Sequence, residues 1–236
     1  SGADQLYPGA QRRLFLTGKD MVAGVWDGGR IFHTHVEFNG RVTNKNPNAN
    51  LSTHATHVAG TIIAGGALAN ARGMAYEGKV YGYDWDNDMN EMSTEAAAGL
   101  LLSNHSYGYG LGWERNDDGN WEWRGPDDAD EDYRFGFYMN VSRNIDIISY
   151  NAPYYQIVWS AGNHRNDTGN GSRPPDGPWD CMGPHAVAKN VLAVGAVMGI
   201  SGGYEAPSDV RMTEISSWGP ADDGRIKPDL VAKGQS

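Results

Sequence analysis

The stretch "MVAGVWDGG", residues 21–29, decides the fold. Six apolar or small residues stop at an aspartate and two glycines, which predicts a buried strand that ends in a tight turn. Similar apolar segments lie at 79–85, 156–163, 190–197 and 227–232. Helix-like segments occupy 56–69 and 93–103. Buried strands that alternate with helices predict an α/β fold, with a mostly parallel central sheet in three α/β/α layers.

Composition excludes several classes of protein. The chain has 236 residues and a net charge of −10, which argues against binding to nucleic acid through its phosphates. It contains no apolar run of membrane-spanning length, and the terminus "SGADQLYPGA" does not read as a signal peptide. The single cysteine, Cys181, excludes a disulfide within this chain and a cysteine-based zinc site, and we interpret it as a spectator thiol.

Three polar side chains stand where catalytic groups gather in parallel sheets, at the carboxyl ends of strands. Asp27 directly follows the first strand, and Asn163 ends the segment "SAGN". His54 begins a predicted helix that Ser52 or Thr53 would cap, so it lies at the positive end of the helix dipole. A histidine base there benefits from a carboxylate partner, which Asp27 could supply, and an Asn163 amide could donate to an oxyanion.

A resemblance to a known family follows from six segments taken in order. "VAGVWDGG", "THATHVAGTI", "SNHSYG", "VWSAGN", "KNVLAVGAV" and "ISSWGPADDGRIKPDLVAKG" resemble segments of the subtilisin-like serine peptidases. The resemblance runs from about residue 20 to the end of the chain. It departs at Ala55, where glycine is usual, and at "HTHVE", where the first pair is usually His-Pro.

The resemblance implies a subtilisin-like catalytic domain over residues 1–236, with 109–135 as a surface excursion. It makes Asp27 and His54 catalytic, makes Asn163 the oxyanion donor, and leaves His57 as a packing or hydrogen-bonding residue. It also implies peptide or protein substrates and a secreted or cell-surface location. The expected substrate-binding residues are Ser106, Tyr107, Gly108, Ser160, Ala161 and Gly162.

The nucleophilic serine of the family lies beyond the segment "KPDLVAKG". Neither Ser236 nor the serines of "SSW" (216–218) fit that role. We therefore expect the domain to be incomplete at its C-terminal end and inactive alone. The remainder would be a second chain or a continuation of this one.

Catalysis by this family requires no cofactor, and we expect no catalytic metal. The resemblance leaves room for a structural calcium ion, but "GGALANARG" replaces the usual calcium loop and offers little besides Asn70. The turn "DWDNDMNE" lacks the glycine of a calcium loop. Its oxygen donors are Asp84, Asp86, Asp88 and Glu91.

Two other functions stay open. A catalytically inactive relative could bind peptides by adding a strand to the "SYG" segment. A metallohydrolase could use the ligands of "HTHVE", which are His33, His35 and Glu37, together with His54 and His57.

Overall fold

The computed structural model describes residues 3–9, 14–200 and 202–235. Its strands are β1 (Val22–Asp27), β2 (Val42–Asn44), β3 (Lys79–Asp84), β4 (Leu102–His105), β5 (Trp113–Arg115), β6 (Trp121–Trp123), β7 (Gln156–Ser160), β8 (Val191–Met198) and β9 (Leu230–Gln235). The α-helices are α1 (Thr53–Ile63), α2 (Asp88–Ala97) and α3 (Asn140–Asn151). Short 3₁₀ helices are η1 (Ala3–Leu6), η2 (Ala69–Ala71), η3 (Trp85–Asn87) and η4 (Pro207–Asp209). Ser236 and parts of the N-terminal stretch lie outside the described residues.

The chain forms two compact units. The first comprises residues 1–106 and 152–157, and the second comprises 107–151 and 158–236. In the first unit the strand order is β2-β3-β1-β4, followed by β7. The pairs of β1 with β3 and β4, and of β2 with β3, are all parallel.

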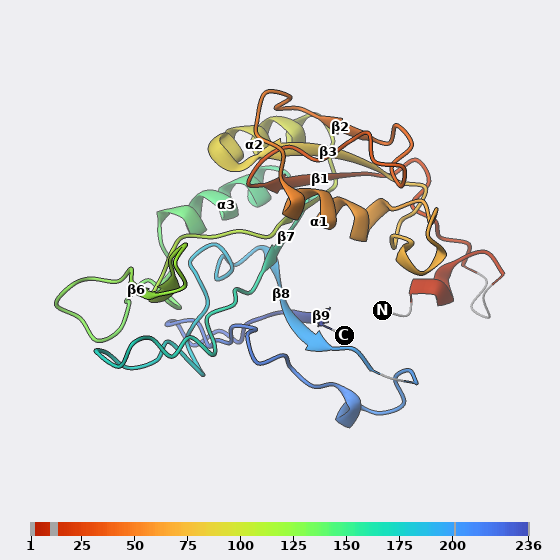
Figure 1. Cartoon of the computed structure of the whole chain (residues 1–236). Helices are drawn as coiled ribbons and strands as arrows, with labels where there is room; N and C mark the ends of the chain where they lie inside the picture. Colours follow the sequence, from red (N-terminus) through yellow and green to blue (C-terminus); the bar gives the residue numbers. More distant parts are fainter. Residues whose placement is uncertain (1–2, 10–13, 201, 236) are drawn as a thin grey trace. The chain divides into compact units, whose positions relative to one another are not determined.

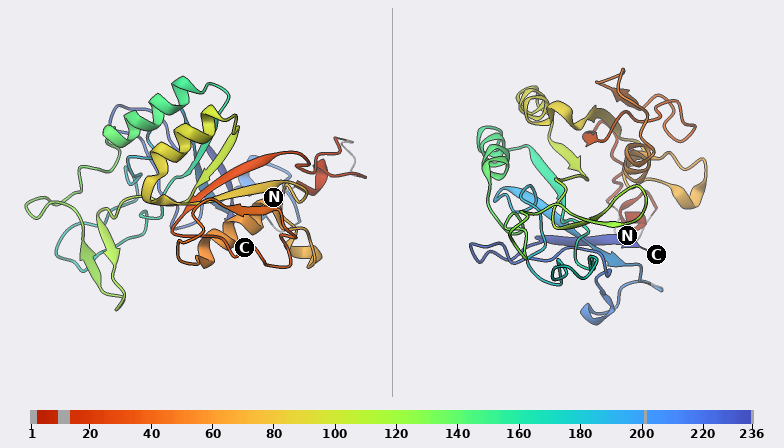
Figure 2. Two further views of the ribbon diagram at one scale, coloured as in Figure 1. Left: turned by 90° about the horizontal axis from the view of Figure 1, so that it is seen from above. Right: turned by 60° about the vertical axis from the view of Figure 1, so that its left-hand side comes forward.

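Helices cover both faces of the sheet in the first unit. Figures 1 and 2 show α1 on one face of β1 and β3 and α2 on the other. The buried residues of α1 are Ala55, Ala59 and Ile63, whose four-residue spacing places them on one stripe. They join Val25 and other strand residues in one core. The predicted α/β fold, with a mostly parallel sheet between helices, is confirmed.

The second unit contains β8 and β9, which pair in parallel. Along β8, buried residues alternate with half-buried ones. A separate antiparallel hairpin, β5–β6, lies in the segment 109–135 and pairs Trp113 with Trp123. The Trp113 side chain is buried, and its Nε1 donates to the carbonyl of Pro174.

The prediction of a helix over 93–103 is wrong in its bounds. α2 begins at Asp88, where the acidic residues Asp88 and Glu91 occupy the first turn and favour the helix dipole. Ser93, predicted to lie at the start, lies inside the helix, and its hydroxyl donates to the carbonyl of Met89. The helix ends before Leu102, which begins β4. Helix α3 was not predicted, although its apolar residues recur at the spacing of one helix face.

Within the described residues, no helix combines the length and the apolar character that crossing a bilayer requires.

Candidate active site

Asp27 and His54, far apart in sequence, meet in the first unit. The Nδ1 atom of His54 lies 2.6 Å from Oδ2 of Asp27. The Asp27 side chain is 3% exposed, whereas that of His54 is 59% exposed. A buried carboxylate thus holds Nδ1 of an accessible imidazole and leaves Nε2 outside that contact. This arrangement orients a histidine to accept a proton.

Neighbouring groups fix the Asp27 carboxylate. Its Oδ1 accepts from the backbone N–H of Gly28 at 2.8 Å and from the hydroxyl of Ser52 at 3.4 Å. The turn that follows requires glycine, because Gly29 has a φ of 135° and an added Cβ would lie 2.4 Å from the carbonyl oxygen of Asn50.

Trp26 anchors the strand immediately before Asp27. Its fully buried indole stacks on Tyr83 with ring centroids 4.1 Å apart, and it also stacks on His105. Its Nε1 donates to Glu91 at 3.0 Å, and the other Glu91 oxygen accepts from Asn46. Glu91, one of the oxygen donors of this turn, therefore has hydrogen bonds at both oxygens. Nothing in the structure tests calcium binding at residues 84–91, a turn that lacks the glycine of a calcium loop.

Ser52 sets the start of the helix that carries His54. Its hydroxyl accepts from the backbone N–H of Ala55 at 3.0 Å, which makes Ser52 the N-cap, one of the two residues predicted for that role. The same hydroxyl contacts Asp27, so one side chain links the helix start to the carboxylate.

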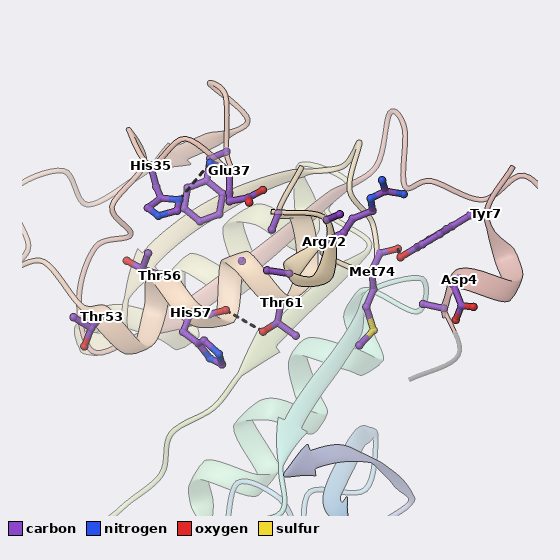
Figure 3. A pocket seen from close by; sticks show the side chains of 16 residues that line it. Asp4, Tyr7, His35, Glu37, Thr53, Thr56, His57, Thr61, Arg72 and Met74 are labelled. Carbon is purple, nitrogen blue, oxygen red and sulfur yellow. Dashed lines mark hydrogen bonds between the residues drawn. The ribbon is translucent and has the colours of Figure 1, made fainter. Parts of the chain in front are cut away.

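His57, for which the resemblance implied a packing or hydrogen-bonding role, lies outside the core. Its side chain is exposed and lines a pocket of about 710 Å³ in the first unit, together with Thr53 and Thr61 (Figure 3). The Thr61 hydroxyl donates to the His57 carbonyl, which is a contact of the backbone and not of the ring. His54 and His57 thus occupy different environments on one helix.

Asn163 lies in the second unit, exposed, just after β7. Ser217 holds both of its neighbours: the backbone N–H of Ser217 donates to the Gly162 carbonyl, and the Ser217 hydroxyl accepts from the backbone N–H of His164. Gly162 has a φ of 105°, and an added Cβ would lie 2.9 Å from the Ser217 hydroxyl oxygen. Ser217 is buried, as is Ser216, so neither is placed to attack a substrate. Nothing in the sequence pattern indicated that Ser217 holds the turn at Asn163.

The predicted substrate-binding residues fall in both units. Ser106 ends the first of the two segments that make up the first unit, and its hydroxyl accepts from the Asn104 amide. In the second unit, Nε1 of Trp159 donates to the carbonyl of Tyr107 at 2.7 Å and so fixes that segment. Ala161 is buried, and its backbone N–H donates to the carbonyl of Val194. The predicted residues Gly108, Ser160 and Gly162 belong to the same second unit.

The ligands proposed for a metallohydrolase do not converge. Among the described residues, His33, His35 and Glu37 form no group with ligand atoms close enough for one ion. The Glu37 carboxylate instead accepts from the backbone N–H groups of 66–68. These hydrogen bonds, the one from Leu68 above all, lower the pKa of Glu37.

His185 is a buried residue that sequence analysis did not single out. It is 5% exposed, stacks on Trp159 at 4.8 Å and contacts the Tyr109 ring at 4.6 Å. Its Nδ1 has no hydrogen-bond partner among the described residues. Burial lowers the pKa of His185 to about 4, because desolvation disfavours the imidazolium.

This buried histidine predicts a loss of stability in acid. The unfolded chain takes up a proton near the ordinary pKa of about 6.5, whereas the folded chain does so only near 4. The contribution of the neutral His185 to the free energy of unfolding is therefore fully present above pH 6.5, and it is lost as the pH falls toward 4. The loss amounts to about 3 kcal/mol, since one pKa unit is worth about 1.4 kcal/mol.

Urea unfolding between pH 7.5 and 4 measures this effect. The variant His185→Phe keeps a ring but cannot titrate. Its free energy of unfolding should therefore fall less over that pH range, by about 3 kcal/mol. His57→Gln, at an exposed position, should keep the original loss. Equal pH dependence in all three proteins would contradict the prediction.

Comparisons with known sequences and structures identify the family and the fold. Residues 27–236 match the sequence model of the peptidase S8, or subtilase, family. A comparison with curated protein sequences gives no significant match.

Three similar solved structures show the same fold. A cold-adapted subtilisin-like serine proteinase is 18% identical, with a TM-score of 0.53 over 93% of this chain and 64% of the other. The psychrophilic protease S41 is 19% identical, with a TM-score of 0.59 over 99% of this chain and 72% of the other. The CspB protease of Clostridium perfringens is 15% identical, with a TM-score of 0.61 over 93% and 76%. Because the family match begins at Asp27 and continues through His54 and Asn163 to the end, the chain belongs to the subtilase family of serine peptidases.

Proposed function

We propose that the chain is the larger part of a subtilisin-like serine endopeptidase, which cleaves peptide bonds through an acyl-enzyme. The observation that carries the proposal is the 2.6 Å contact between buried Asp27 and exposed His54. In this proposal His54 is the general base, Asp27 orients and stabilises it, and Asn163 donates to the oxyanion. Peptide or protein substrates, and action at the cell surface or after secretion, follow from the same proposal.

The chemistry assigns a separate task to each nitrogen of His54. Nδ1 carries a hydrogen and donates it to Asp27, which fixes the tautomer with a lone pair on Nε2. Nε2 removes the proton of a serine hydroxyl as that oxygen attacks the peptide carbonyl. The imidazolium so formed lies near the positive start of α1, which disfavours it, and the Asp27 carboxylate offsets this effect.

The nucleophile belongs to the proposal as well. We propose that a serine outside these 236 residues attacks the substrate, supplied by a continuation of this chain or by a second chain. Two observations support this: Ser216 and Ser217 are buried, and the chain spans 64% of the cold-adapted proteinase. The fragment alone should then be inactive, because the base has no hydroxyl to activate.

A serine-directed probe tests the proposal. The intact protein, with any segment that follows residue 236, is treated with a fluorophosphonate, and mass spectrometry locates the modified residue. We expect one modified serine outside residues 1–236, with a parallel loss of peptide hydrolysis. A chelator should change neither the labelling nor the rate of hydrolysis of the untreated protein.

Two outcomes would contradict the endopeptidase. Peptide binding without hydrolysis or labelling would favour the inactive peptide-binding relative. Loss of hydrolysis in chelator, without labelling by the probe, would favour a metalloenzyme.

A further inference from the structure

A group of metal-ligating side chains lies in the second unit, in the segment between β7 and β8. One ligand atom each from His164, Asp167 and Asp176 lies within 4.8 Å of the other two. All three side chains are partly buried. The residues described by the structure hold no other such group of histidine, cysteine and acidic side chains.

The spacing of His164 and Asp167 suits two ligands of one ion. Nδ1 of His164 is buried and has no hydrogen-bond partner among the described residues. The distance from this atom to Oδ2 of Asp167 is 3.4 Å, longer than a good N–H···O hydrogen bond of about 2.7–3.2 Å. Tetrahedral ligands bound at about 2.0–2.2 Å lie roughly 3.4 Å apart.

Backbone hydrogen bonds hold the three residues together without any ion. The N–H of Asp167 donates to the carbonyl of His164 at 3.2 Å, and that of Asp176 donates to the carbonyl of Asp167 at 3.0 Å. Oδ2 of Asp176 accepts from the backbone N–H of Trp113 at 2.8 Å, an outer contact of the kind that orients metal ligands. The carboxylate packs so closely against Gly112 that an added Cβ there would lie 2.4 Å from each of its oxygens.

We propose that His164, Asp167 and Asp176 bind one Zn²⁺ ion, with water completing its coordination. One imidazole nitrogen and two carboxylate oxygens are ligands that zinc accepts in four-coordinate sites. Calcium instead takes six to eight oxygen ligands and has no preference for imidazole. Because no step of the proposed peptide hydrolysis uses these residues, the site stands independently of that function.

The site would connect two segments of the second unit. His164 directly follows Asn163, while Asp176 is bonded to Trp113 at the start of β5. A zinc ion here would tie the turn at Asn163 to the β5–β6 hairpin.

Equilibrium dialysis of the chelator-treated chain against zinc chloride tests the proposal. We expect one zinc ion per chain and a higher melting temperature with zinc than without it. The variants Asp167→Asn and His164→Gln should bind zinc at least about tenfold more weakly, the loss that removal of an outer partner alone can cause. Asp117→Asn, which removes the same charge at an exposed position, should bind as the original chain does.

Cobalt provides a second measurement that does not depend on stability. Co²⁺ bound by the original chain should show the visible absorption of a tetrahedral complex, and the folded variants should not. Zinc binding of equal strength in Asp167→Asn, His164→Gln and the original chain would overturn the site. Stabilisation by calcium but not by zinc would overturn the choice of metal.

Discussion

Replacing His54 by alanine in the intact protein should lower kcat by about 10⁶-fold, the size of the effect of the corresponding change in a subtilisin. The cause is loss of the group that receives the serine proton. The imidazole is 59% exposed and lies outside the core, so the variant should fold with nearly unchanged stability. Steady-state hydrolysis of a peptide substrate and thermal unfolding measure the two quantities.

His57→Ala is the matched control for that change. It removes an exposed histidine three residues further along the same helix and should leave kcat nearly unchanged. If both folded variants lost the same large factor, His54 would have no special role in the proposed reaction.

Replacing Asn163 by alanine should lower kcat by about 10²–10³-fold and change KM little. An oxyanion donor acts on charge that develops only in the transition state, so substrate binding does not depend on it. The size is that observed for the oxyanion asparagine of a subtilisin.

The control for Asn163 is Asn166→Ala, a second exposed asparagine of the same segment, which should keep kcat. A rise in KM at constant kcat in Asn163→Ala would indicate substrate binding and not an oxyanion role. Unchanged kinetics would leave Asn163 as a turn residue only.

The sequence was most informative where a local pattern determines local structure. The apolar run before Asp27 predicted β1, and Ser52 was one of two predicted caps of the helix at His54. Asp27 lies at the end of a strand and His54 at the start of a helix, and such positions gather at the carboxyl edge of a parallel sheet. The contact between these two residues could therefore be expected from the sequence. The bounds of α2 could not, since the acidic residues at its start are equally typical of a polar turn.

Contacts between distant loops left no such pattern. Ser217 holds the residues on either side of Asn163 from more than fifty positions away. His164 and Asp167 are close in sequence, but Asp176 is brought near them by a segment that forms neither helix nor strand. Neither arrangement depends on a strand or helix period, so single-sequence analysis could not place these side chains together.

The two hydrogen bonds made by Ser217, one donated and one accepted, have a consequence for the entropy of the proposed reaction. A free turn would have to be ordered each time a substrate reacts, at about 1–2 kcal/mol of conformational entropy for each residue fixed. In this chain Gly162 and His164 are already tied to Ser217. The turn that presents Asn163 therefore loses its conformational freedom once, when the protein folds, and not again at each turnover.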